Sequence, residues 1–160
     1  MEKMEIKNAA TVILLRGSQK NPEVLMGQRG KNASFMPNKF VFPGGALDPG
    51  DSEIDFNGDI PTKCIEKLRL KADPSLAKPL IAAGIRELWE ETGLILGSKS
   101  KTKMDSIPKN WKDFFALGYQ PSADNIEFVF RAITPPGRTR RFDARFFLLS
   151  SDNIKGDLDD

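Results

Sequence analysis

The clearest feature of this sequence is a segment with the periodicity of an amphipathic helix. We expect the helix to run from Ser75 to Thr92, with Ser75 as its N-cap and Gly93 at its end. Pro79 is near enough to the first turn to be tolerated. On a helical wheel the apolar side chains of this segment fall on one arc and three glutamates fall on another. One face therefore packs against the rest of the molecule, and the other concentrates negative charge.

Shorter segments on both sides of this helix predict strands and two further helices. The expected strands are residues 10–15 and 23–28, which form a hairpin around a turn at 17–22, and then 39–42, 126–133 and 142–149, the last two separated by a turn at 135–137. Short helices are expected at 62–71 and 111–117. Pro43, Gly44 and Gly45 break regular pairing and predict a loop. The fold class is therefore α/β, with a mixed sheet and helices packed on it.

Composition bounds the size and class of the protein. A chain of 160 residues that is 39% hydrophobic and 29% charged predicts a single globular domain over residues 1–160. The 24 basic and 22 acidic residues nearly cancel, so the overall charge does not favour nucleic acid as a partner. No apolar run is long enough to span a bilayer, and the single cysteine, Cys64, favours a reducing compartment. We therefore expect a cytoplasmic protein without a membrane partner.

The sequence contains no histidine, which excludes several kinds of active site. Neither a Ser-His or Cys-His dyad nor an imidazole metal site can be built from this chain alone. Acid–base chemistry must therefore use carboxylates or metal-bound water.

Carboxylates are concentrated on the polar face of the expected helix. Glu87 lies three residues from Glu90 and four from Glu91, spacings at which like charges repel by roughly a few tenths of a kcal/mol per pair. A divalent cation reverses the sign of that interaction, and hard ions such as Mg²⁺ or Mn²⁺ prefer oxygen ligands. For such a string taken alone, a solvated acidic face is the alternative interpretation.

The sequence around these glutamates resembles a known motif. Residues 86–94, Arg-Glu-Leu-Trp-Glu-Glu-Thr-Gly-Leu, are similar to the second half of the Nudix box at every fixed position. Residues 44–51 resemble its first half, with Asp51 in place of the usual glutamate. The two halves are farther apart than is usual in that family, which we interpret as an insertion at about residues 52–78.

The resemblance implies roles for particular residues. As in Nudix hydrolases, Glu87, Glu90 and Glu91 would bind catalytic Mg²⁺ or Mn²⁺, and a backbone carbonyl of Gly44 or Gly45 would add a ligand. Arg86 would orient a glutamate. The implied reaction is attack of water on one phosphorus of a nucleoside diphosphate linked to another moiety, a small-molecule substrate. For the residue that accepts the proton of water, Glu87 is the first choice and Glu127 the second.

Other segments are similar to a Nudix branch that includes peroxisomal-type coenzyme A diphosphatases. Arg29 and Phe42 match the signature associated with that branch, whereas Ser34 and Asn38 stand where arginine and glycine are usual. The expected substrate-binding residues are Arg29, Phe42, Arg140 and Arg141. For the arginines of residues 138–145, solvent exposure along a strand is the alternative.

The family also implies a Nudix-like α/β/α sandwich that continues past residue 149 with a strand and a C-terminal helix. Only the polar, acidic segment 150–160 remains here, so we expect that strand and helix to be lacking. Either the chain is a fragment, or a partner subunit, such as a second copy in a homodimer, covers the exposed edge. Two alternative functions stay open: a catalytically impaired nucleotide-binding module on a Nudix scaffold, and RNA-cap or other nucleic-acid processing.

Overall fold

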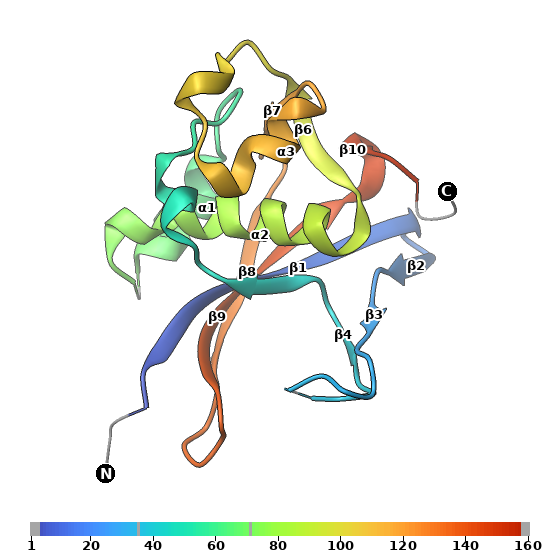
Figure 1. The fold of residues 1–160 in the computed structure, drawn as a ribbon. Coiled ribbons are helices and arrows are strands. Elements are labelled where there is room, and N and C mark those ends of the chain that lie inside the picture. The colour runs from blue at the N-terminus through green and yellow to red at the C-terminus, as the bar shows by residue number, and fades with distance from the viewer. Residues whose placement is uncertain (1–3, 35, 71, 158–160) are drawn as a thin grey trace.

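The computed structural model describes residues 4–34, 36–70 and 72–157 (Figure 1). Their elements follow in the order β1 (Ile6–Ser18), β2 (Asn21–Val24), β3 (Gly27–Gln28), β4 (Phe40–Val41), β5 (Gly44–Ala46), η1 (Pro49–Glu53), α1 (Thr62–Arg69), η2 (Pro74–Leu76), α2 (Ala77–Thr92), β6 (Ile95–Lys99), η3 (Met104–Ser106), η4 (Lys109–Trp111), α3 (Lys112–Ala116), β7 (Tyr119–Pro121), β8 (Glu127–Ile133), β9 (Arg141–Ser150), η5 (Ser151–Asn153) and β10 (Ile154–Lys155), where η marks a 3₁₀ helix. The architecture is α/β, as the sequence predicted.

A mixed sheet forms the centre of the molecule. Its strands lie in the order β2-β1-β9-β8, and β5 pairs with β1 on the same edge as β2. The β1–β9 pair is parallel, whereas β8 is antiparallel to β9 and both β2 and β5 are antiparallel to β1. The remaining strands form a small sheet, β10-β6-β7, and the β3–β4 pair.

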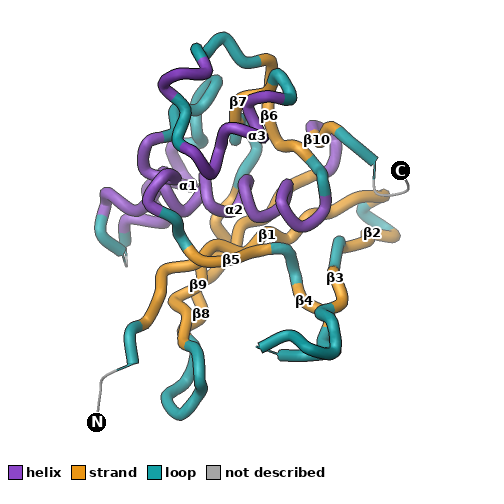
Figure 2. Tube along the Cα trace, in the orientation of Figure 1, coloured by secondary structure: helices purple, strands orange, loops and turns teal. Residues whose placement is uncertain are grey.

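Helix α2 packs across one face of this sheet. Ala10 and Val12 of β1 are fully buried beneath it, and a Cβ added at Gly84 would lie 3.3 Å from Val12. The missing side chain at Gly84 therefore lets helix and sheet approach closely. Helix α1 lies beside α2 on the same side, and Figure 2 shows α3 above them, so the described helices lie on one side of the sheet.

Most of the element predictions are confirmed. The β1–β2 and β8–β9 hairpins, the two short helices and the end of α2 lie where the sequence placed them, and Gly93 ends α2 in the left-handed conformation, with φ 74°. Of the expected helix 62–71, Lys71 lies outside the described residues.

Three expectations were wrong in detail. Ser75 does not cap α2, because Asp73 accepts hydrogen bonds from the Ser75 backbone N and Oγ at 2.9 and 2.8 Å and starts η2, which leads into the helix. The diglycine segment is not a loop but strand β5, whose pairing with β1 has the register Thr11↔Gly44 and Ala10↔Gly45. The tail after β9 is not devoid of a strand, because β10 pairs with β6.

The opposite face of the central sheet is less covered. Because side chains alternate along a strand, Ala9, Thr11, Ala144 and Phe146 face away from α2. Phe146 stacks on Phe130 at 4.1 Å between ring centroids, and Phe130 is 48% exposed. Across the described part of the chain, no helix combines the length and the apolar character needed to cross a membrane.

Candidate active site

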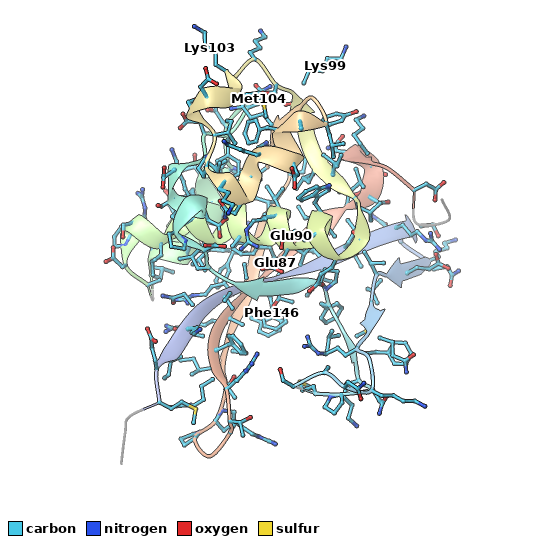
Figure 3. The ribbon with its side chains drawn as sticks, viewed as in Figure 1. Glu87, Glu90, Lys99, Lys103, Met104 and Phe146 are labelled. Carbon is cyan, nitrogen blue, oxygen red and sulfur yellow. The ribbon has the colours of Figure 1, made fainter. Side chains whose placement is uncertain are left out.

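Helix α2 places two of its glutamates against the diglycine strand β5. A Cβ added at Gly45 would overlap the carboxylate of Glu87, so only glycine fits there without displacing that carboxylate. The backbone N of Gly44 donates to Glu91 Oε2 at 3.4 Å. Figure 3 shows Glu87 and Glu90 together next to β5. The structure thus brings the glutamates and the diglycine segment together, although these segments are more than 40 residues apart in the chain.

Arg86 connects two of the glutamates to a buried aspartate. Its Nε and Nη2 donate to Asp51 Oδ1 and Oδ2 at 2.9 and 3.0 Å, and its Nη1 donates to Glu87 Oε1 at 2.9 Å and to Glu90 Oε2 at 3.1 Å. Nη2 also donates to the Ala46 carbonyl at 3.1 Å. All five guanidinium N–H groups therefore have an acceptor, which fixes the plane of the side chain.

Burial and charge shift the ionisation of this group of residues. Burial raises the pKa of Glu87, although the neighbouring Arg86 opposes the shift. Partial desolvation and the charge of Glu87 raise the pKa of Glu91, and the Gly44 N–H opposes this. Burial by itself lowers the pKa of Arg86, but the hydrogen bonds and charges of Asp51 and Glu87 outweigh it and the net shift is upward. The carboxylates therefore lie within electrostatic reach of one another.

In residues 4–157, apart from the two undescribed positions, no three acidic, histidine or cysteine side chains are already arranged to hold a metal ion. The carboxylates of Glu87 and Glu90 are directed to Arg86, and that of Glu91 to Gly44. The side chain of Glu90 is 40% exposed and that of Glu87 is 16% exposed, so Glu90 has more freedom to turn than Glu87.

A cavity of about 1120 Å³ lies on the other side of β5 from the glutamates. Its walls include residues 26–29, residues 36–42 and the β8–β9 hairpin. Its lining also includes Gly44, Gly45 and Phe146, the last of which Figure 3 draws on the opposite side of β5 from Glu87. The expected substrate-binding residues all line this cavity: Arg29, Phe42, Arg140 and Arg141. We call Glu87, Glu90 and Glu91 the acidic cluster. The diglycine strand β5 therefore lies between the cavity and the acidic cluster.

Arg29, which lines the cavity, interacts electrostatically with Glu91 of the acidic cluster. Its positive charge, together with the Gly44 N–H, opposes the net upward shift in the pKa of Glu91. Its Nε is buried without a hydrogen-bond partner among the described residues. A buried donor without an acceptor is costly, so a ligand oxygen at this position would restore the missing bond.

The structure separates two further candidates, Arg145 and Glu127, from this cavity. Arg145 is 3% exposed and donates to Asn8 Oδ1 at 2.7 Å and to the Asp143 carbonyl at 2.9 Å, so it stabilises the sheet instead of lining the cavity. Glu127 is exposed at the start of β8, where its charge influences Cys64 of α1. Neither residue lines the cavity.

Two of three comparisons with known proteins found similar proteins. No family model matches the sequence. The chain is 31% identical over 157 residues to the putative Nudix hydrolase 7 of Caenorhabditis elegans, covering 92% of this chain and 45% of that protein, so it spans less than half of the relative's length. Its structure is similar to the crystal structure of a Nudix hydrolase from Alicyclobacillus acidocaldarius, with a TM-score of 0.71, 26% identity, and coverage of 95% of this chain and 72% of that one.

This chain has a Nudix fold. The sequence relative and the structural neighbour together support its place in the Nudix hydrolase superfamily. Within that fold the two segments that resemble the halves of the Nudix box occupy β5 with η1 and the second half of α2. The segment between them folds as α1 and η2.

One residue beside these charged groups was not predicted from the sequence. Trp111 Nε1 donates to Asp51 Oδ1 at 2.9 Å, across 60 residues of sequence. Trp111 was expected only to begin a short helix, and no local pattern pairs it with Asp51. The apolar wall formed by Phe146 was also missed, because alternation along a strand does not reveal which face remains open.

Proposed function

We propose that this protein is a divalent-metal-dependent diphosphatase that hydrolyses a nucleoside diphosphate linked to another moiety, with coenzyme A-like molecules as the substrate class. The observation that carries the proposal is the diglycine strand, which lies against Glu87 and Glu91 on one side and lines an arginine-containing cavity on the other. A diphosphate crossing this strand would have its phosphates near the acidic cluster and its remaining part in the cavity.

The residues of the acidic cluster fit a hard cation in their chemistry. Every candidate ligand is an oxygen, from Glu87, Glu90, Glu91 and a carbonyl of Gly44 or Gly45, and Mg²⁺ or Mn²⁺ prefer such ligands. The raised pKa values of Glu87 and Glu91 reflect desolvation and mutual repulsion, which a cation would offset. When bound, the metal would neutralise phosphate charge and lower the pKa of coordinated water.

The protein's own residues would position the reactants. Arg29 would donate to a phosphate oxygen, and Phe42 would contact the apolar part of the substrate. Water oxygen would bond to one phosphorus as the bond from that phosphorus to the bridging oxygen breaks. A carboxylate would take the proton of water, and a nucleoside monophosphate and a phosphorylated fragment would leave. We assign the proton transfer to Glu87, whose side chain is 16% exposed and whose carboxylate lies against β5, next to the place proposed for the phosphates.

A substrate screen tests the proposal. Coenzyme A, ADP-ribose, NADH, dinucleoside polyphosphates and nucleoside triphosphates would each be incubated with the protein and Mg²⁺, Mn²⁺ or EDTA, and the products separated by chromatography. We expect metal-dependent cleavage of the diphosphate bond, fastest with coenzyme A, whose nucleotide product would be adenosine 3′,5′-bisphosphate. Equal rates with EDTA would contradict metal dependence, and a preference for another substrate would overturn the coenzyme A-like class.

One observation favours a second candidate function, a nucleotide-binding module with impaired catalysis. Arg86 forms ion pairs with both Glu87 and Glu90, which reduces the negative charge available to a cation. Under this alternative, calorimetry would detect binding of nucleotides without turnover in the screen, and adding Mn²⁺ would not change the affinity.

Arg29→Met is expected to raise KM about tenfold with a smaller change in kcat, because a charge-assisted hydrogen bond to phosphate is lost. Steady-state kinetics on the best substrate of the screen would measure both constants. Arg69→Met, on the exposed surface of α1, is the matched control and should leave both constants unchanged. An unchanged KM in Arg29→Met would remove Arg29 from the substrate site.

Two further features remain predictions. A second copy of the chain is expected to cover the exposed sheet edge at the C-terminal end, which analytical ultracentrifugation would detect as a dimer. We also expect the protein to reside in the cytoplasm, which fluorescence microscopy of the tagged protein would check.

A further inference from the structure

Trp111 lies outside the acidic cluster and the cavity, yet it contacts the residue that holds Arg86. It is fully buried at the end of η4, immediately before α3. Its ring packs edge-on against Phe114, with centroids 5.2 Å apart, and Phe114 in turn packs against Trp89 of α2 at 5.6 Å. This aromatic contact attaches the segment containing α3 to the helix that carries the glutamates.

The carboxylate of Asp51 is shared between Trp111 and Arg86. Asp51 is 1% exposed, and its Oδ1 accepts from both Trp111 Nε1 and Arg86 Nε at 2.9 Å. Its Oδ2 accepts from Arg86 Nη2 at 3.0 Å and from the Asp48 backbone N at 2.8 Å. A buried carboxylate requires such donors, and each one restricts its orientation.

The segment containing Trp111 is also held close to η1. A Cβ added at Gly50 would overlap the side chain of Asn110, so Asn110 can lie directly over the residue that precedes Asp51. Trp111 and Asp51 are therefore positioned by two neighbouring contacts, one polar and one steric.

We infer that Trp111 is a positioning residue for the candidate active site: its indole N–H orients Asp51, Asp51 orients Arg86, and Arg86 sets the carboxylates of Glu87 and Glu90. Each step is a hydrogen bond of 2.9 to 3.1 Å between planar groups. The catalytic part of this inference rests on the proposed function. The positioning of Arg86 does not, because it is a property of the folded protein.

Trp111→Phe is the sharpest test, because phenylalanine keeps an aromatic ring in the core and removes only the donor and part of the volume. Phe114→Leu is the matched control, because it disturbs the same aromatic cluster without touching a hydrogen bond of Asp51. We expect hydrogen exchange of the Arg86 Nε–H, followed by NMR, to be at least about tenfold faster in Trp111→Phe and nearly unchanged in Phe114→Leu.

Metal binding and turnover supply the second readout. In Trp111→Phe, Mn²⁺ affinity measured by calorimetry and kcat are each expected to fall about 5- to 30-fold, with KM changed less than about twofold. Phe114→Leu is expected to lower thermal stability while keeping both values close to those of the wild type. The inference is overturned if the two variants give the same exchange rates and Mn²⁺ affinities. It is also overturned if, in Trp111→Phe, both the exchange rate of the Arg86 Nε–H and the Mn²⁺ affinity equal those of the wild type.

The wild-type protein provides a test that needs no variant of Trp111. The indole N–H of Trp111 should resist hydrogen exchange more strongly than that of Trp89, with Trp89→Phe used to assign the two resonances. Equal exchange of the two would overturn the inference. Retained slow exchange and Mn²⁺ binding in a wild type that hydrolyses none of the screened nucleotides would instead reject the proposed function and leave the positioning role in place.

Discussion

Glu91→Gln and Glu90→Gln are each expected to lower metal-dependent kcat at least about 100-fold, because several kcal/mol of transition-state stabilisation depend on a correctly held cation. Glutamine keeps the size of the side chain and removes its negative charge. Both side chains are exposed, so the folded state should change by less than about 1 kcal/mol. Steady-state kinetics with Mg²⁺ and Mn²⁺ would measure kcat, calorimetry would measure Mn²⁺ affinity, and thermal unfolding would measure stability.

Glu66→Gln is the control for this experiment. Glu66 is an exposed glutamate on α1 outside the acidic cluster, and its substitution should leave kcat, metal affinity and stability unchanged. If Glu90→Gln and Glu91→Gln retain wild-type turnover and Mn²⁺ binding, the acidic face of α2 is a solvated surface and the proposed metal site does not exist.

Alanine substitutions at the two glycines of β5 are expected to differ in their main effect. Gly44→Ala should mainly lower stability, and Gly45→Ala should mainly lower activity. A Cβ at position 44 would lie 2.5 Å from the Ala10 carbonyl oxygen and 2.8 Å from Thr11 Cα, both backbone atoms of β1. Relief of this overlap requires the β1–β5 pairing to shift, so Gly44→Ala should destabilise the protein by about 1–3 kcal/mol or more. Each kcal/mol corresponds to a decrease of roughly 2–4 °C in the melting temperature of a chain of this size.

At position 45 the three atoms nearest to the added Cβ all belong to the carboxylate of Glu87, the end of a flexible side chain. That carboxylate can turn aside, but it then leaves its place beside β5, and an N–H of the buried Arg86 loses its acceptor. We therefore expect Gly45→Ala to lower the melting temperature less than Gly44→Ala does and to lower kcat by about 10- to 100-fold.

The two variants control for each other, since both add one methyl group to the same short strand. Thermal unfolding and steady-state kinetics on both proteins would be compared. A Gly45→Ala protein with full activity would show that the position of Glu87 against β5 is not required. A fully stable Gly44→Ala protein would contradict the close approach of β5 to β1.

The predictions from sequence succeeded where the physical cause was local. Gly93 ends α2 because glycine adopts the left-handed conformation readily, and the β1–β2 hairpin follows from two apolar segments flanking turn residues. Prediction failed where a tertiary contact decided. Proline and paired glycines indicated a loop, but the lack of side chains at Gly44 and Gly45 instead allows β5 to approach β1 and α2 closely.

The same distinction applies to the candidate site. The helical periodicity of α2 placed Glu87, Glu90 and Glu91 on one face without knowledge of the fold, because residues three and four apart lie on the same side of a helix. The sequence by itself also excluded histidine chemistry. Only the tertiary structure decided that this face meets the diglycine strand, that Arg86 is held by Asp51 and Trp111, and that the arginines at 29, 140 and 141 line one cavity whereas Arg145 is buried in the sheet. These contacts join residues far apart in the chain, and they depend on how strands and helices pack, which no local pattern of side chains specifies.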